Sequence, residues 1–161
     1  MSFIIRDSTG NDISLLTNLI RQSFKDVAER FNLTAHNAPN HPSNCTEEWI
    51  IKAIQNDNKY YILEHQSVPC GCVALEQANS EVCYLERLGI LPNYRNKGFG
   101  KALVNHIIQK AKNRNAKRVE IGIMAENIEL KNWYKKQGFI ERSTMKYKHL
   151  PFEVLFLFKE L

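Results

Sequence analysis

Apolar residues recur along this chain at two spacings, one typical of helices and one typical of strands. A short apolar run at 3–6 predicts a strand, and the turn-like segment that follows leads into positions spaced three or four residues apart, which predict an amphipathic helix. Thr46, followed by Glu47 and Glu48, suits the start of a second helix that continues to about residue 56. Residues 32–45, rich in Asn, His, Pro and Ser, are predicted to form a long loop between the two helices. The spaced apolar positions of the first helix are Ile13, Leu16, Ile20 and Phe24.

The rest of the chain alternates between the two patterns. Strand-like runs lie at 60–64, 68–76 and 82–90, and a helix with one apolar stripe follows residue 100. A further strand is predicted at 118–124, then a helix that Gly138 ends, and finally two strands around Pro151. The order β-α-α-β-β-β-α-β-α-β-β predicts an α/β fold in three layers.

Composition narrows the class of protein. Of the 161 residues, 43% are hydrophobic and 24% are charged, which is close to the average for globular proteins. No apolar run approaches the roughly 20 residues that span a bilayer, and the first residues turn polar too early for a secretory signal, so a cytoplasmic protein with reduced cysteines is expected. The formal net charge of +5 favours an anionic partner without saying which kind.

One glycine-containing segment lies between the strand at 82–90 and the helix after it. Its sequence is Arg95-Asn-Lys-Gly-Phe-Gly-Lys101. Free N–H groups and the positive end of the helix dipole attract an anion at such a junction, and Gly98 and Gly100 let a phosphate approach the backbone. The segment lacks the Gly-Lys-Ser/Thr of a Walker P-loop and the glycine spacing of a dinucleotide-binding fingerprint. It is therefore predicted to bind a phosphate by another route.

Two segments resemble the motifs of a known family. Residues 88–101, Leu-Gly-Ile-Leu-Pro-Asn-Tyr-Arg-Asn-Lys-Gly-Phe-Gly-Lys, resemble motif A of the GNAT superfamily of N-acetyltransferases, whose core is Arg/Gln-x-x-Gly-x-Gly/Ala after a strand. Asn127 followed by Trp133-Tyr-Lys-Lys-Gln-Gly-Phe139 resembles the family's later motif, an Asn and then Tyr-x-x-x-Gly-Phe. The resemblance implies a single N-acetyltransferase domain over residues 1–161, with a mixed, mostly antiparallel central sheet flanked by helices.

The resemblance also implies that acetyl-CoA is the co-substrate and that no metal is required. The backbone groups of Leu88 and Ile90 are expected to pair with the pantetheine arm, and a bulge at Gly89 to splay two parallel strands apart. The pyrophosphate is expected to rest on backbone N–H groups, with charge supplied by Lys97 and Lys101. The N–H groups in question belong to Arg95, Asn96, Lys97, Gly98, Phe99, Gly100 and Lys101.

Acetyl transfer to an amine needs a neutral nucleophile, stabilisation of an oxyanion and a proton for the departing thiolate. By resemblance, Tyr134 is the general acid, Asn127 contacts the cofactor arm and the N–H of Ile90 polarises the thioester carbonyl. Alternation along the strand at 82–90 predicts that Glu86 points toward the acceptor, so Glu86 is the candidate general base. The strand face so predicted comprises Tyr84, Glu86, Leu88 and Ile90.

Each of the three side chains also has a structural interpretation. Asn127 suits the N-cap of its helix, and Tyr134 suits a core position next to another aromatic ring. Glu86 suits a half-exposed strand position paired with a nearby Arg or Lys. The sequence leaves both interpretations open.

Histidines and cysteines outside these motifs carry weaker signals. His36, His41 and Cys45 lie in the long loop, but structural zinc usually has four ligands, so a substrate-covering loop or plain structure is expected. Cys70 and Cys72 stand two apart in a predicted strand, which would place both thiols on one face as packed side chains.

The predicted function is transfer of an acetyl group from acetyl-CoA to a primary amine by direct attack in a ternary complex. The acceptor is a small amine or a peptide or protein amine, which the resemblance implies is bound by residues 24–50 and 143–155, and we expect neither a nucleic acid nor a membrane as partner. The alternatives are a non-catalytic acyl-CoA-binding sensor and, more weakly, a basic nucleic-acid-binding domain, which lacks a recognition motif here. The apolar run at 154–158 fits either a homodimer interface or a buried central strand.

Overall fold

The computed structural model describes residues 2–161. The helices are α1 (Ile13–Arg30), α2 (Glu47–Gln55), α3 (Phe99–Asn113) and α4 (Ile128–Lys136), with short 3-10 helices η1 (Gly10–Asp12), η2 (Pro42–Asn44) and η3 (Pro92–Tyr94). The strands are β1 (Phe3–Asp7), β2 (Lys59–His65), β3 (Val68–Gln77), β4 (Val82–Ile90), β5 (Arg118–Met124), β6 (Ile140–Lys146) and β7 (Glu153–Glu160). The predicted order of helices and strands is confirmed, and the 3-10 helices are additional to it.

The strands form one sheet in the order β1-β2-β3-β4-β5-β7-β6. Every neighbouring pair is antiparallel except β4 and β5, which are parallel, so the sheet is mixed and mostly antiparallel as expected. The apolar run at 154–158 belongs to β7, which pairs with β5 on one side and β6 on the other. It is therefore an inner strand of the sheet, with Leu155 and Leu157 buried.

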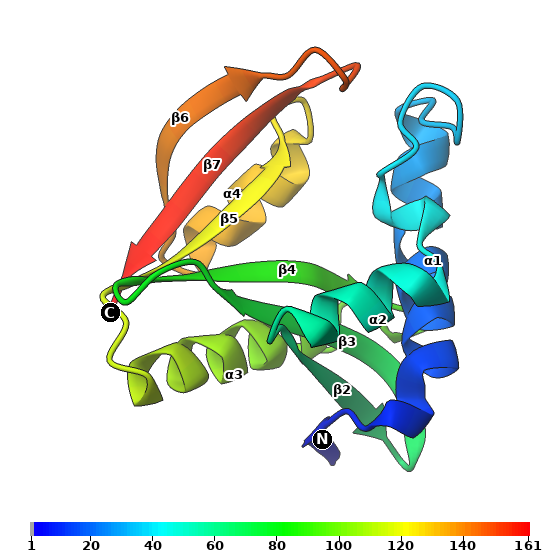
Figure 1. Cartoon of the computed structure of the whole chain (residues 1–161), viewed down its shortest axis with the longest axis vertical. Coiled ribbons are helices and arrows are strands. Elements are labelled where there is room, and N and C mark those ends of the chain that lie inside the picture. Colours follow the sequence, from blue (N-terminus) through cyan, green and yellow to red (C-terminus); the bar gives the residue numbers. More distant parts are fainter. Residues whose placement is uncertain (1) are drawn as a thin grey trace.

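Helices cover both faces of the sheet and enclose two main cores (Figure 1). Helices α1 and α2 pack on one face, while α3 and α4 pack on the other, which gives the predicted three layers. None of the helices in residues 2–161 is long and apolar enough to cross a membrane. The α1 side includes Leu16, Ile20, Ile50, Ile62 and Cys72, and the α3 side includes Leu75, Phe99, Leu103, Ile107 and Tyr134.

A β-bulge in β3 separates two cysteines that the sequence pattern placed together. The register between β2 and β3 shifts at Leu63 and Glu64, which leaves Cys70 as the extra residue. Cys70 packs in the α3-side core and Cys72 in the α1-side core. The prediction that both thiols share one face is wrong, because a bulge inserts one residue and reverses the alternation beyond it.

A second bulge, in β4, has consequences for the site. Ala74 pairs with Glu86 and Cys72 with Gly89, so two residues of β4, Arg87 and Leu88, stand opposite one residue of β3. Arg87 has a φ of 54°, in the left-handed region that side chains other than glycine seldom adopt. The bulge therefore lies at Arg87 and Leu88, before the predicted position at Gly89.

The bulge also corrects the predicted strand face. Beyond it, Leu88 and Ile90 pack against the α3-side core, whereas Glu86 stays on the α1 side of the sheet. The prediction that Glu86 shares a face with these two residues is wrong. Gly89 faces α1, and a Cβ atom there would lie 2.7 Å from the Cβ of Ser23. Glycine is needed at this position because α1 crosses β4 at that close distance.

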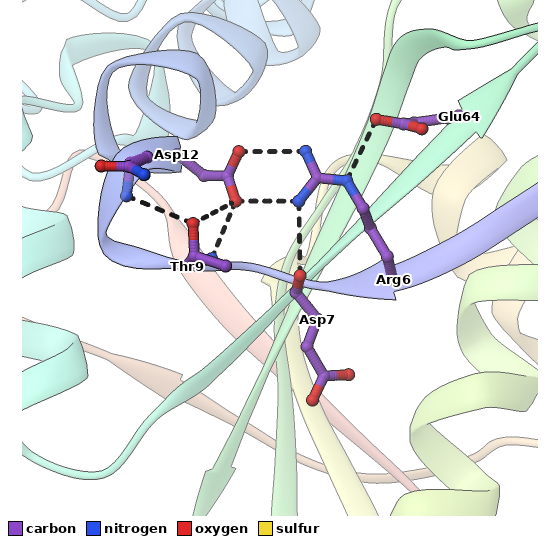
Figure 2. Close-up of polar contacts among 6 residues, drawn as sticks. Arg6, Asp7, Thr9, Asp12 and Glu64 are labelled. Carbon is purple, nitrogen blue, oxygen red and sulfur yellow. Dashed lines mark hydrogen bonds and ion pairs between the residues drawn. The ribbon is translucent and has the colours of Figure 1, made fainter.

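Charged and polar side chains fix the junction between β1 and α1 (Figure 2). The guanidinium of Arg6 donates to both carboxylate oxygens of Asp12, at 2.8 and 3.0 Å, and to Glu64 at 3.0 Å. Asp12 also accepts from the backbone N–H of Thr9 at 2.8 Å, completing a capping box at the start of η1. The hydrogen bonds from Arg6 lower the pKa of Asp12 to about 2, although burial opposes the shift.

We expect Asp12→Asn to lower the free energy of unfolding at pH 7 by about 1–3 kcal/mol, because it removes a charged, mostly buried partner of Arg6. Since the pKa of Asp12 is lower in the folded state, its stabilisation is present above its usual value of 3.8 and is lost as the pH falls from there toward about 2. Urea denaturation of wild type and Asp12→Asn at pH 7 measures the loss of stability, and the same measurement at pH 2.5 shows how much of the difference disappears in acid. Asp57→Asn, at an exposed position, is the control and should change little. Equal stability of wild type and Asp12→Asn at pH 7 would contradict the expectation.

Candidate active site

The parallel strands β4 and β5 are joined only where they begin. Residues 82–84 of β4 pair with residues 118–120 of β5, and no pairing between them continues beyond Tyr84. Strand β5 instead stays paired with β7 as far as Met124, so the sheet opens into a V (Figure 1). Leu88 and Ile90 lie on the open length of β4. Unpaired backbone groups along such an edge can accept an extended chain as an additional strand.

The segment after β4 leads to the N-terminus of α3 and leaves its N–H groups free. Gly98 and Asn96 have left-handed backbones, with φ of 84° and 61°, and no side chain caps the helix. Within residues 2–161, none of the N–H groups of residues 96–101 donates to a protein acceptor. Lys97 and Lys101 are exposed beside them. A row of free N–H groups at a helix N-terminus, with two cations, suits a phosphate group.

Arg95 differs from the rest of that segment. Its N–H donates to the carbonyl of Pro92 at 3.3 Å, and its guanidinium points to α1, where it contacts Asp26 at 2.5 Å and the carbonyl of Ser23 at 2.8 Å. It also donates to the carbonyl of Ile90 at 3.0 Å. The ion pair lowers the pKa of Asp26. Arg95 therefore fastens α1 to the end of β4, and the free N–H groups begin at Asn96 instead of at Arg95.

Close packing brings α4 next to the N-terminus of α3. A Cβ atom on Gly100 would lie 3.1 Å from the ring of Trp133, so glycine permits the approach of the two helices. Tyr134 follows Trp133 and is 4% exposed, with edge-on contacts to Trp133 and to Phe139 at ring-centroid distances of 4.9 and 5.5 Å. Both structural and catalytic interpretations of Tyr134 are compatible with this packing.

The hydroxyl of Tyr134 is available for chemistry. It has no hydrogen-bond partner in residues 2–161, yet it is not among the unpaired polar atoms that are sealed from solvent there. Burial of the ring raises the pKa of Tyr134 well above its usual value of 10. The hydroxyl therefore stays protonated at neutral pH and can donate.

Asn127 is the N-cap of α4, as its structural interpretation predicts. Its Oδ1 accepts from the N–H of Leu130 at 3.2 Å and from the guanidinium of Arg30 at 2.9 Å. Arg30 lies at the end of α1, so this bond joins α1 to α4 across the open side of the sheet. Arg30 could not be singled out from the sequence, because its partner lies 97 residues away.

Glu86 is half-buried on the α1 face, beside Glu76 of the neighbouring strand. Burial, followed by the adjacent Glu76 carboxyl, raises the pKa of Glu86 to about 8. A carboxyl with a pKa in this range can exchange a proton near neutral pH. The sequence did not single out Glu76, whose influence depends on the pairing of β3 with β4.

A cavity of about 390 Å³ lies between β4, β5 and the β6–β7 hairpin, with Glu86 in its wall. Glu120, also in the wall, is 5% exposed and pairs with Arg118 at 3.1 Å and Arg142 at 3.0 Å. The remaining lining is largely aromatic or apolar. It includes Tyr84, Met145, Tyr147 and Phe156. The predicted acceptor-binding segment 143–155 contributes Ser143, Met145 and Tyr147 to this wall.

The long loop between α1 and α2 packs against the same side of the sheet. His41 is 9% exposed, accepts from the N–H of Ser43 through Nδ1, and lies edge-on to Phe24 at 6.0 Å. Burial, with a smaller contribution from Arg87, lowers the pKa of His41 to about 4. Within residues 2–161, no three His, Cys, Asp or Glu side chains gather as a metal site would require.

Comparison with known proteins identifies the family. A model of the acetyltransferase (GNAT) family matches residues 15–139, which is most of the chain. The chain belongs to the GNAT family. This GNAT protein is 29% identical over 105 residues to an uncharacterised N-acetyltransferase of Methanocaldococcus jannaschii, and the match covers 62% of the chain but only 46% of that relative. The chain thus spans less than half of the length of this relative.

Solved structures share the GNAT fold. A GNAT family acetyltransferase from Elizabethkingia anophelis with acetyl-CoA bound has a TM-score of 0.71 at 18% identity, over 99% of this chain and 98% of that one. The PaiA N-acetyltransferase from Thermoplasma acidophilum, in complex with coenzyme A, has a TM-score of 0.77 at 19% identity and full coverage of both chains. At these identities the likeness establishes the fold.

Proposed function

We propose that this GNAT protein transfers an acetyl group from acetyl-CoA to a primary amine. The observation that supports this most is the open edge of β4, with the free N–H groups of residues 96–101 beyond one end and Glu86 on the same strand. A phosphate fits the free N–H groups, and an extended amide-containing arm fits the strand edge at Leu88 and at the N–H of Ile90, whose carbonyl already accepts from Arg95. The two solved structures that contain acetyl-CoA or coenzyme A have the same fold.

The proposed roles follow from the protonation of two groups. Acetyl-CoA supplies the thioester. Glu86 accepts the proton that the amine loses as its nitrogen bonds to the carbonyl carbon, directly or through a water molecule. Tyr134 donates its proton to the sulfur as the carbon–sulfur bond breaks. The N–H of Ile90 polarises the carbonyl, and Asn127, already bound to Arg30 and Leu130 through Oδ1, retains its amide NH₂ group for the cofactor arm.

Acetyl-CoA binding tests the first half of the proposal. Acetyl-CoA at about a hundred times its dissociation constant should stabilise the protein by roughly 2.7 kcal/mol, or on the order of 5–10 °C in melting temperature. Gly98→Val should weaken binding about tenfold or more, because a branched side chain cannot hold the left-handed backbone that orients the free N–H groups. Gly10→Val is the control, because a Cβ atom at Gly10 meets nothing within 4 Å.

The outcomes separate the parts of the proposal. Stabilisation of the wild type and of Gly10→Val, with a much weaker effect on Gly98→Val, supports an anion site at residues 96–101. Thiol release that depends on an added primary amine supports transfer. If acetyl-CoA does not stabilise the wild type at millimolar concentration, the proposed function is wrong.

A further inference from the structure

Arg87 carries a cation that the protein itself does not neutralise. The residue is half-buried, yet its guanidinium forms neither an ion pair nor a hydrogen bond with any group in residues 2–161. Its nitrogen atoms are not among the unpaired atoms that are closed to solvent in the same part of the chain. Five N–H donors in a partly desolvated position are thus open to a ligand.

The bulge in β4 directs this cation to the α1 and α2 side of the sheet, next to Glu86 in the cavity wall, although Arg87 does not itself line the cavity. Arg87 holds a left-handed backbone, with φ of 54°, which costs free energy and is typical of functional positions when a side chain other than glycine adopts it. The guanidinium lies over the ring of Trp49 in α2, with its central carbon 5.8 Å from the ring centroid. Glu86, just before the bulge, and Arg87, within it, therefore both project on the α1 and α2 side of the sheet, whereas Leu88 projects on the other side.

No carboxylate forms an ion pair with Arg87 within residues 2–161. Two carboxyls on the same face, Glu86 and Glu76, form none with it, and their mutual proximity favours a proton on Glu86. His41, Cys45 and Tyr60, which Arg87 influences, are neutral, and the other charged group that acts on Cys45 is a second cation, Arg21. A half-buried guanidinium without an anion is unfavourable, so an anionic ligand would bind there with little competition.

We propose that Arg87 binds a carboxylate of the acceptor, so that the acceptor is a small amine with a carboxylate near the amine, as in an α-amino acid. This inference rests on the proposed function and names the acceptor class for the same site. Glu86 then faces the amine and Arg87 the carboxylate, on adjacent positions of one strand. The aromatic and apolar wall of the cavity, including Tyr84, Tyr147 and Phe156, is left for the amino-acid side chain.

Matched acceptors test this directly. We would measure thiol release with acetyl-CoA and L-phenylalanine, L-methionine or L-glutamate, each beside its α-carboxamide, which keeps the amine and removes one charge. The carboxamide also represents the amino end of a peptide. Because an α-carboxamide makes the amine less basic, intrinsic reactivity at neutral pH favours the amide. The wild type is nevertheless expected to prefer at least one amino acid about tenfold or more in kcat/KM, the scale of a bidentate guanidinium–carboxylate pair.

Variants at Arg87 separate charge recognition from a general defect. Arg87→Gln should lower kcat/KM for the preferred amino acid about 10–100-fold, mainly through KM, and leave the carboxamide within about threefold. Arg87→Lys should recover part of the preference, since it keeps the charge without the planar fork. Arg114→Gln, which changes a half-buried arginine at the far end of α3, is the control. Melting temperatures with acetyl-CoA confirm that each variant is folded.

A binding measurement distinguishes this inference from the proposed function. With coenzyme A present, calorimetric titration of L-phenylalanine, L-methionine and L-glutamate into wild type and Arg87→Gln needs no turnover. Arg87-dependent binding of an amino acid without acetylation would support the carboxylate site and contradict transfer. A wild-type preference for carboxamides, equal losses on both acceptors in Arg87→Gln, or no Arg87-dependent binding of any amino acid would each overturn the inference.

Discussion

Tyr134→Phe is expected to lower kcat for acetyl transfer about 100- to 1,000-fold, while the dissociation constant of acetyl-CoA stays within about threefold. Phenylalanine keeps the edge-on contacts with Trp133 and Phe139, so the core of α4 is preserved. Only the proton that we assign to the leaving sulfur is lost. Burial raises the pKa of the Tyr134 hydroxyl, which keeps it protonated until a thiolate develops beside it.

A second buried tyrosine provides the control for this prediction. Tyr61 in β2 is also 4% exposed and also packs in the α3-side core, but it has no proposed role in transfer. Tyr61→Phe should leave kcat unchanged within about twofold. Single-turnover thiol release with a saturating amine measures the chemical step in both variants. If Tyr134→Phe retains kcat within about threefold of wild type, Tyr134 is a core residue and not the general acid.

Much of the fold could be predicted because local patterns decided it. The 3.6-residue stripes of α1 and α3 each bury one face of a helix, and the apolar runs of β2 and β3 form inner strands that are buried on both faces. The N-caps expected from the sequence are also present: Thr46 accepts from the N–H of Trp49, and Asn127 caps α4. These are interactions between residues close in the sequence, which is why the sequence carried their signal.

The bulge in β3 and the exact position of the bulge in β4 could not be predicted, and the bulge in β4 decides which side chains face the candidate site. An extra residue at Cys70 or at Arg87 depends on how two strands align, and the sequence of one strand does not fix that. Alternation therefore placed Glu86 with Leu88 and Ile90, whereas the structure separates them and exposes Arg87 beside Glu86. A bulky arginine at a left-handed backbone position has no signature in a single sequence.

Contacts between distant segments were missed for the same reason. The motif at residues 95–101 was predicted to bind phosphate throughout, yet the Arg95 guanidinium contacts Asp26, 69 residues away. Arg30 and Asn127 are joined over a comparable span. Both contacts fix α1 across the open side of β4. The family motifs indicated a candidate site, but they did not indicate which of its side chains stabilise the fold.

Glu86→Gln is expected to lower kcat/KM about 100-fold near pH 8 and to change the pH profile as well. With its pKa raised to about 8, Glu86 acts as a base only when deprotonated, so wild-type kcat/KM should rise with pH up to that value and then level off. An acceptor amine whose own pKa lies well below that of Glu86 keeps the titration of the substrate from obscuring this rise. The variant should lack the rise altogether. An unchanged profile in Glu86→Gln would mean that Glu86 is not the base.

Glu76→Gln provides the companion test, because Glu76 raises the pKa of Glu86 without itself being assigned a step. Removing its charge should move the rise in kcat/KM to lower pH and leave the plateau within about threefold.

The folding stability of Glu86→Gln gives an independent check, and the direction of the expected change is definite. A carboxyl whose pKa is higher in the folded state holds its proton more tightly there, so folding stability is lost as the pH rises from about 4.5 to about 8. Glu86→Gln removes this loss and should therefore melt at the same or a higher temperature than wild type at pH 8. A variant that is inactive yet no less stable can have lost only chemistry, which separates the base from a residue that merely holds β4 in place.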